Sequence, residues 1–219
     1  TLISNSDAHS LNNLGREANV FNLSDKPSYI EITDIIKTGD RKKFLYTIEF
    51  YPEEGKYHYD GHAVCKVCLA PAETKRKNFV CPVCKKNLTV GVLHRVEDLA
   101  DRPDFAEASS GEGKFIPHKY IVPLREIIAK VFDVGVSSKK VLKEHELLIN
   151  KIGNEFFILL HANISVIEKQ ATDKNIALAV ANMRSGNVKV TPGYDGIFGS
   201  VEVNLPLAKP LLLTLTIPP

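Results

Sequence analysis

The sequence predicts a protein of the α+β class, in which a small β-rich zinc-ribbon-like domain is followed by a mainly helical domain. All four cysteines lie in one short stretch, Cys65 to Cys84, and β-rich segments flank it. Helix signals dominate after Pro123. We expect a zinc-binding domain at 25–100, a linker at 101–115 and a helical domain at 116–203, with 204–219 unassigned.

The composition is that of an ordinary soluble globular protein. The 219 residues are 44% hydrophobic, and 28 Lys and Arg against 26 Asp and Glu give a net charge of +2. Affinity for nucleic acid would therefore come from local patches. No apolar run approaches the roughly 20 residues needed to cross a bilayer, so no membrane partner is expected. Reduced thiols without a signal peptide favour the cytoplasm.

The cysteines form two Cys-x-x-Cys pairs, Cys65 with Cys68 and Cys81 with Cys84. Two such pairs direct four thiolates to one point, and structural zinc is the usual occupant. Iron in the same thiolates is the main alternative. Two other interpretations of the cysteines are less expected. Disulfides would suit a small secreted domain, but no signal peptide is found, and a thioredoxin-like redox motif needs only one Cys-x-x-Cys pair.

Basic side chains crowd the cysteine pairs. They are either a surface for a phosphate backbone or a solvated face, and the sequence leaves both open. These residues are Lys66, Lys75, Arg76, Lys77, Lys85 and Lys86.

The N-terminal stretch contains Asp7 and His9, two residues apart in a polar loop after a β-like start. At this spacing both side chains can turn to one metal, although the pattern is also typical of a hydrogen-bonded turn. A helix is expected over Ser28–Thr38, with Ser28 and Glu31 as a capping box and Gly39 as its end.

A hairpin is expected next, from Phe44–Tyr51 through a turn to Lys56–Asp60. Alternation along its second strand would place tyrosines on one face and titratable groups on the other. These residues are either contacts for DNA bases or half-buried strand residues beside the cysteine pairs. They are Tyr57, His58, Tyr59, Asp60 and His62.

After the cysteines, Leu88–Leu93 is expected to close the zinc unit as a strand, followed by a short helix at His94–Ala100 with a structural His94. At the other end of the chain, Val188–Gly199 contains an Asp-Gly turn and predicts a hairpin.

The C-terminal half is expected to be mainly helical. The first helix follows Pro123 and stops at Gly135, and the second runs from about Ser138 to Gly153. A Ser165–Glu168 capping box begins a further helical stretch. Asp173 caps the last helix, which closes at Gly186. At the N-terminus of the second helix, free amides could hold a phosphate, with contacts from Ser138, Lys139 and Lys140.

Taken together, these motifs resemble the archaeal and bacterial endonuclease Q family over residues 1 to about 203. That family couples a PHP (polymerase and histidinol phosphatase) metallo-phosphoesterase domain to a four-cysteine zinc domain and a helical C-terminal domain. The matching pieces are Ser6–Ser10, Phe50–His62, the cysteine pairs, Gly91–Glu97 and Gly193–Gly196.

The resemblance implies that residues 1–24 are the C-terminal remnant of a PHP domain, with Asp7 and His9 as ligands of its catalytic metal cluster. The family nicks DNA 5′ of deaminated bases such as uracil and hypoxanthine, and at abasic sites, by metal-assisted phosphodiester hydrolysis. A lesion base would be swung out of the base stack into a pocket, and the residues of the Tyr57–His62 cluster are candidates for contacts to it.

The chain departs from the PHP pattern in one respect, because no His-x-His occurs in it. We therefore expect a C-terminal portion of a longer protein, inactive alone, with catalytic divalent metals bound only by the full-length protein. The alternative is a non-catalytic zinc module that binds a DNA-repair or replication protein, and a third possibility is a purely structural ribbon.

Overall fold

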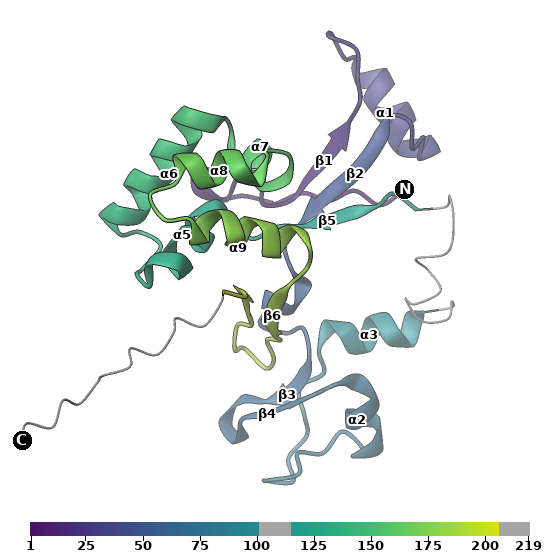
Figure 1. Cartoon of the computed structure of the whole chain (residues 1–219). Coiled ribbons are helices and arrows are strands. Elements are labelled where there is room, and N and C mark those ends of the chain that lie inside the picture. Colours follow the sequence, from purple (N-terminus) through teal and green to yellow (C-terminus); the bar gives the residue numbers. More distant parts are fainter. Residues whose placement is uncertain (101–114, 206–219) are drawn as a thin grey trace, which may run out of the picture. The chain divides into compact units, whose positions relative to one another are not determined.

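The computed structural model describes residues 1–100 and 115–205, which form two compact units (Figure 1). The first comprises Thr1–Pro123 and Val188–Glu202, and the second comprises Leu124–Asn187 and the residues from Val203. The expected linker, 101–115, and the tail, 204–219, lie almost wholly outside the described residues. Within the described part of the chain, no helix is long and apolar enough to cross a membrane.

A three-stranded sheet, in the order β1-β2-β5, lies in the first unit. Strand β2 (Phe44–Glu49) pairs antiparallel with β1 (Ala18–Phe21) and parallel with β5 (His118–Tyr120). Two apolar side chains of the central strand β2 are buried, since Phe44 and Ile48 are 0% and 2% exposed, whereas Leu45 is 38% exposed. The rings of Phe21 and Phe44 lie 4.5 Å apart.

The expected first helix is confirmed as α1 (Tyr29–Thr38), which follows a short 3-10 helix (Leu11–Asn13) and β1. The Glu31 N–H donates to Ser28 Oγ at 3.1 Å, and Gly39 ends the helix at a φ of 64°. The reciprocal half of the capping box is not formed, because the Glu31 carboxylate accepts from Ser24 and pairs with Lys43.

The expected hairpin after Phe44–Tyr51 is wrong. Strand β2 has neighbours on both edges, and Pro52 begins a 3-10 helix (Pro52–Glu54) instead of a turn between paired strands. The next strand, β3 (Asp60–His62), pairs antiparallel with β4 (Val67–Leu69). The alternation expected along Lys56–Asp60 therefore does not occur.

The rest of the cysteine-containing region has little regular structure. A 3-10 helix (Ala63–Cys65) joins β3 to β4, and α2 (Pro71–Arg76) follows. The expected closing strand is reduced to isolated bridges, including Gly61 with Thr89. Helix α3 (Val92–Leu99) begins earlier than expected.

The second unit is a bundle of short helices around an apolar core (Figure 1). Its helices are α5 (Leu124–Phe132), α6 (Lys139–Ile152), α7 (Glu155–Leu160), α8 (Ile164–Gln170) and α9 (Asn175–Arg184). Each contributes fully buried side chains, among them Ile127, Leu148, Ile158, Ile167 and Val180.

Of the four signals expected at the ends of α5, α6 and α8, two are correct and two are not. Ser138 caps α6, and Gly153 ends it. Asp133, at a φ of 52°, follows the last residue of α5 and takes the role expected of Gly135. The cap of α8 is Asn163 rather than Ser165, because Asn163 Oδ1 accepts the Ser165 N–H at 3.0 Å.

The expected hairpin near the C-terminus is confirmed by a two-stranded sheet of β6 (Val188–Thr191) and β7 (Ser200–Val203). Asp195 and Gly196 have φ values of 44° and 87°, and positive values at both central residues are what a type I′ turn requires. We call residues 192–199, which join the two strands, the clamp loop.

Candidate metal centre and pocket

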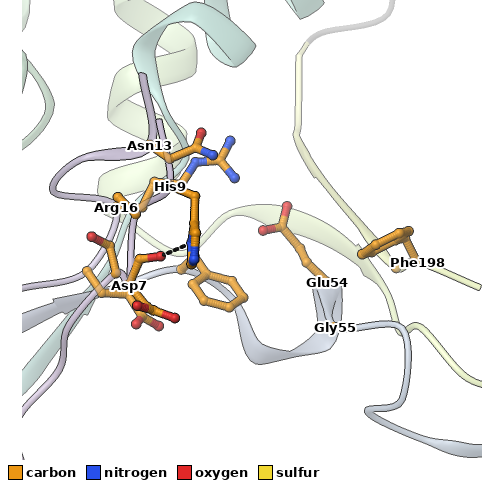
Figure 2. Close-up of a pocket in the computed structure, with 12 residues that line it drawn as sticks. Asp7, His9, Asn13, Arg16, Glu54, Gly55 and Phe198 are labelled. Carbon is orange, nitrogen blue, oxygen red and sulfur yellow. Dashed lines mark hydrogen bonds between the residues drawn. The ribbon is translucent and has the colours of Figure 1, made fainter. Parts of the chain in front are cut away.

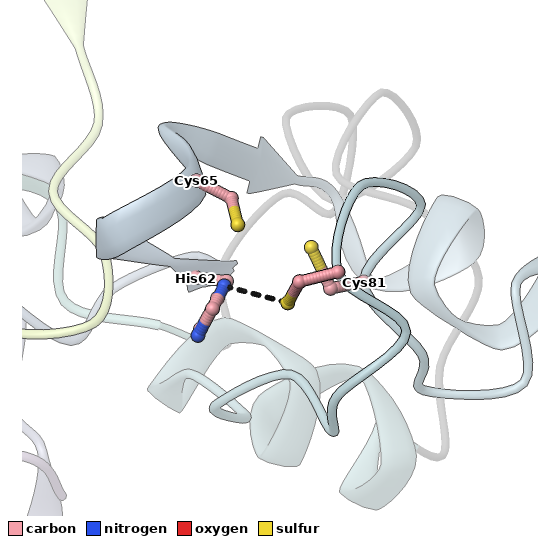
Figure 3. A group of neighbouring side chains, drawn as sticks. His62, Cys65 and Cys81 are labelled. Carbon is pink, nitrogen blue, oxygen red and sulfur yellow. Dashed lines mark hydrogen bonds between the residues drawn. The ribbon is translucent and has the colours of Figure 1, made fainter.

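Four side chains of the first unit converge on one point and could hold a metal ion (Figure 3). Their ligand atoms all lie within 4.8 Å of one another. One imidazole and three thiols match the Cys₃His donor set of structural zinc sites. The four residues are His62, Cys65, Cys81 and Cys84.

The ligands sit on two chain segments with the same local geometry. His62 and Cys65 are three residues apart, as are Cys81 and Cys84. Each segment is followed by a lysine with a left-handed backbone, Lys66 at a φ of 54° and Lys85 at 62°. The Lys85 N–H donates to the Cys81 carbonyl and the Lys66 N–H to the Ala63 carbonyl, both at 3.0 Å. These turns direct the paired side chains to one side. We call them knuckle one (62–65) and knuckle two (81–84).

Cys68, an expected ligand, is not part of this group. It lies in β4 opposite Gly61, while His62 takes its place. Burial is the main cause that raises the pKa of the Cys68 thiol, and the carboxylates of Asp60 and Glu73 add to it. The sequence spacing is compatible with a His62/Cys65 pair, because fifteen residues separate Cys65 from Cys81. That separation is within the range found between the two ligand pairs of zinc motifs.

The thiols of the group differ in acidity. Burial, with hydrogen bonds to Cys84 and Cys81, raises the pKa of Cys65 to about 11. Burial also opposes ionisation of Cys81, but the backbone N–H groups of Cys84 and Val83 outweigh it and lower its pKa to about 6. Since a thiolate is the form that binds metal, the lowered pKa makes Cys81 the more readily ionised candidate ligand of the two at neutral pH.

A buried polar pair fixes helix α3 beside knuckle one. Asp60 is 0% exposed, and its carboxylate accepts the Gly91 N–H at 2.7 Å and lies 2.6 Å from His94 Nδ1. His94 is 3% exposed, in keeping with its expected structural role. Asp60 was expected as a DNA contact, but in this structure it has no exposed surface to offer.

The clamp loop is tied to knuckle one through Asp195. Its carboxylate accepts the Ala63 N–H and the Thr89 hydroxyl, each at 2.6 Å. These two hydrogen bonds, the one from Thr89 foremost, lower the pKa of Asp195. The Tyr194 ring packs so closely on Gly61 that any side chain there would collide with it. The Gly193–Gly196 motif therefore has a structural role.

The expected aromatic cluster lies before knuckle one. The rings of His58 and Tyr59 stack with centroids 5.4 Å apart, whereas Tyr57 is 46% exposed. Burial lowers the pKa of His58 and is the main cause that raises the pKa of Tyr59. Of the expected base contacts, Tyr57 thus presents the most open ring.

The expected basic contacts lie at the surface, and some have partners. Lys75 pairs with Asp98 at 2.7 Å, which lowers the pKa of that carboxyl. Lys85 donates to the Pro82 carbonyl. In the second unit, Ser138 Oγ accepts the Val141 N–H, and the Lys140 ammonium lies 3.9 Å from the Phe132 ring centroid. The remaining exposed ones are Arg76, Lys77, Lys86 and Lys139.

Asp7 and His9 line a pocket of about 480 Å³ in the first unit (Figure 2). His9 Nδ1 lies 2.8 Å from the Asp7 backbone carbonyl. Because a carbonyl only accepts, Nδ1 is the donor in this contact, and Nε2 is the ring nitrogen that it leaves uninvolved. Within residues 1–100 and 115–205, three or more such ligand side chains gather only at the His62 group, so Asp7 and His9 do not make a complete metal cluster.

The pocket also contains residues that sequence reasoning missed. In Figure 2, Asp7, His9, Asn13 and Arg16 gather on one side, Phe198 stands on the opposite side, and Glu54 lies between them. Phe198 comes from the clamp loop, far from the others in sequence, and no local pattern could have placed it there.

Comparison with known proteins relates the chain to a family of proteins and to two solved structures. Residues 123–187 match the MJ0043 C-terminal domain. The uncharacterized protein MJ0043 of Methanocaldococcus jannaschii is 32% identical over 205 residues, which is 91% of this chain and 25% of that protein. The uncharacterized protein YqxK of Bacillus subtilis is 27% identical over 91% of this chain and 46% of its own length. The chain therefore spans less than half of the curated relatives that it matches.

Two solved structures share the fold. The lesion-specific endonuclease PfuEndoQ from Pyrococcus furiosus matches with a TM-score of 0.78 and 27% identity, over 92% of this chain and 48% of that one. An endonuclease Q in complex with a 27-mer duplex that carries an abasic lesion at the active site matches with a TM-score of 0.72 and 28% identity, over 92% of this chain and 49% of that one. The resemblance expected from the motifs is thus confirmed: the chain resembles endonuclease Q over nearly all of its described length.

Proposed function

We propose that this chain is the DNA-binding and lesion-recognition portion of a metal-dependent endonuclease that nicks DNA 5′ of deaminated bases or abasic sites. The observation that carries the proposal is the similarity to a lesion-specific endonuclease over 92% of the chain at a TM-score of 0.78. The second endonuclease Q structure supports it, since that protein was solved with an abasic duplex. This portion would act in the cytoplasm.

The proposed role of the His62 group is to bind a structural zinc ion. The donor set fits zinc, and Cys81 is fully buried, as befits a closed structural site. A bound ion would hold the two knuckles together. The hydrogen bond from the Ala63 N–H to Asp195 would then fix the clamp loop to knuckle one.

The proposed role of Asp7 and His9 is that of a remnant of a PHP active site. Catalytic divalent metals, bound in a longer protein, would supply a hydroxide nucleophile and neutralise phosphate charge. The contact of His9 Nδ1 with the Asp7 carbonyl supports this role, because Nε2 of a neutral ring would be the ligand atom. With two such residues, the chain alone is expected not to cleave DNA.

The proposed grip on DNA comes from the exposed cations around the knuckles and at the start of α6, which would pair with phosphates. The half-buried His58 and Tyr59 and the exposed Tyr57 would meet bases. The phosphate contacts would be Lys75, Arg76, Lys77, Lys85, Lys86, Lys139 and Lys140, with Ser138 amides beside them.

The test is the affinity of the zinc-loaded chain for a duplex with one central uracil, compared with the same duplex undamaged, at two salt concentrations. We expect tighter binding to the uracil duplex and a loss of affinity as salt rises. Charge reversal at Lys77 and Lys86 should weaken binding to both duplexes and flatten the salt dependence. Absence of binding to either duplex would contradict the proposal and favour a module for a protein partner.

A further inference from the structure

Phe198 is a large aromatic side chain that the fold leaves in solvent. It is 73% exposed, although it lines the pocket that contains Asp7 and His9. Single exposed apolar residues are common on protein surfaces, so exposure alone assigns no role. What distinguishes Phe198 is how its loop is held and what lies beside its ring.

The backbone of the clamp loop is fixed to the turn that precedes the aromatic cluster. Gly193 N–H donates to the Glu53 carbonyl at 2.8 Å, Gly199 N–H to Glu54 at 3.1 Å, and Gly196 N–H to Lys56 at 2.9 Å. A Cβ at Gly193 or Gly199 would collide with backbone atoms of this turn. Phe198 is therefore presented from a rigid support, so little loop ordering would oppose the binding of a ligand to its ring.

One cation lies near two exposed rings, of which the Phe198 ring lines the pocket. Lys56 Nζ is 5.7 Å from the Phe198 ring centroid and 5.6 Å from that of Tyr57. Sites for unpaired nucleotides combine these same elements, an aromatic face on which a base stacks and a cation beside the backbone.

We propose that Phe198 is the stacking platform for an unpaired nucleobase and that Lys56 binds the adjoining phosphate. This inference rests on the proposed function and deepens it, because it names the residues that hold the displaced nucleotide. Stacking is sequence-tolerant, since every base has a π-face. The platform therefore supplies affinity for an extruded nucleotide, and groups deeper in the pocket supply discrimination.

The experiment compares matched variants of the zinc-loaded chain in binding to a fluorescein-labelled duplex with one uracil, across a salt series. Phe198→Ala should weaken binding about tenfold, within the roughly 5- to 150-fold range of stacked bases, and leave the salt dependence unchanged. Phe198→Trp should retain affinity. Lys56→Gln should reduce the slope of log affinity against log salt by about 1. Tyr29→Ala and Lys37→Gln, both exposed positions on α1 outside the pocket, are the controls and should behave as wild type.

Phe198→Leu separates stacking from general apolar contact, because it keeps bulk without a π-face. We expect it to lose affinity as Phe198→Ala does, with an unchanged thermal unfolding midpoint for both. Wild-type affinity in Phe198→Ala or Phe198→Leu would overturn the inference and leave the proposed function standing. Failure of the wild-type chain to bind would overturn both.

Discussion

The metal-binding region and the helical unit are held together by different forces. In residues 56–99, which contain the His62 group, the buried side chains are mostly polar or sulfur-containing, namely Asp60, Thr74, Cys81 and His94, with the apolar Pro71 and Leu88. The helical unit instead buries Leu124, Ile127, Ile128 and many similar side chains completely. The hydrophobic effect can therefore stabilise the helices, whereas residues 56–99 bury little apolar area, and we expect their fold to depend on an ion bound by the His62 group.

Removal of the metal should give the largest difference between the two regions. Because structural zinc contributes on the order of 10 kcal/mol to folding, chelation should abolish amide protection in residues 56–99. The helices from Leu124 to Arg184 should keep their protection. Hydrogen exchange read by mass spectrometry measures both regions in one sample, and equal loss in both would break the comparison.

Substitution of single ligands should sharpen the assignment of the metal group. Cys65→Ser and His62→Ala should each lower zinc stoichiometry and expose residues 56–99, because each removes one of four donors. Cys68→Ser is the matched control and should keep one bound zinc per chain. The four-cysteine arrangement would instead be supported if Cys68→Ser lost zinc and His62→Ala retained it.

A cavity in the helical core should produce the converse result. Leu148 is 0% exposed, and Leu148→Ala should destabilise the helical unit by about 2–5 kcal/mol. Denaturant unfolding followed by far-UV circular dichroism measures this loss. Zinc affinity should stay at the wild-type value, and a large fall in it would show that the two units do not fold independently.

Loss of Asp195 should have a smaller effect, at the join between the clamp loop and knuckle one. Asp195→Ala leaves the Ala63 N–H and the Thr89 hydroxyl without their acceptor, at a cost of about 1–3 kcal/mol. We expect faster transfer of zinc to a chelator, measured with a colorimetric indicator. Lys43→Ala, which removes an ion pair with Glu31 outside residues 56–99, is the control and should transfer zinc at the wild-type rate.

The smallest expected effect is a pH dependence in the helical unit. Burial opposes ionisation of Glu155, but hydrogen bonds from His145 and the Leu124 N–H lower its pKa. A carboxyl with a lowered pKa contributes stability above its unfolded pKa of about 4.3, and the contribution is lost as pH falls through the folded value. Glu155→Gln should therefore reduce the slope of the unfolding free energy between about pH 5 and pH 3, and an unchanged slope would refute this role.

Local signals were predictable from the sequence, and non-local ones were not. The caps Ser28 and Ser138 and the helix ends Gly39 and Gly153 depend on neighbours within a few residues. The pairing of β2 with β5 joins segments far apart in the chain and left no local pattern.

The same distinction applies to the candidate site. Three of the four members of the candidate metal group were expected from the cysteine spacing, whereas His62 was not, because Cys68 lies in β4 opposite Gly61 and that pairing is not visible in the spacing. The pocket gathers Asp7, Glu54 and Phe198 from three distant segments, so only its Asp-x-His portion was visible in the sequence.

If a bound zinc ion holds residues 56–99 in the form that recognises a DNA lesion, the preference for damaged DNA must depend on the metal. The most direct measurement is the affinity for the uracil-containing duplex, relative to the undamaged duplex, before and after chelation of zinc. We predict that chelation removes the preference for the damaged duplex and that added zinc restores it. An undiminished preference in the metal-free chain, whose helices remain folded, would show that lesion recognition does not depend on the metal.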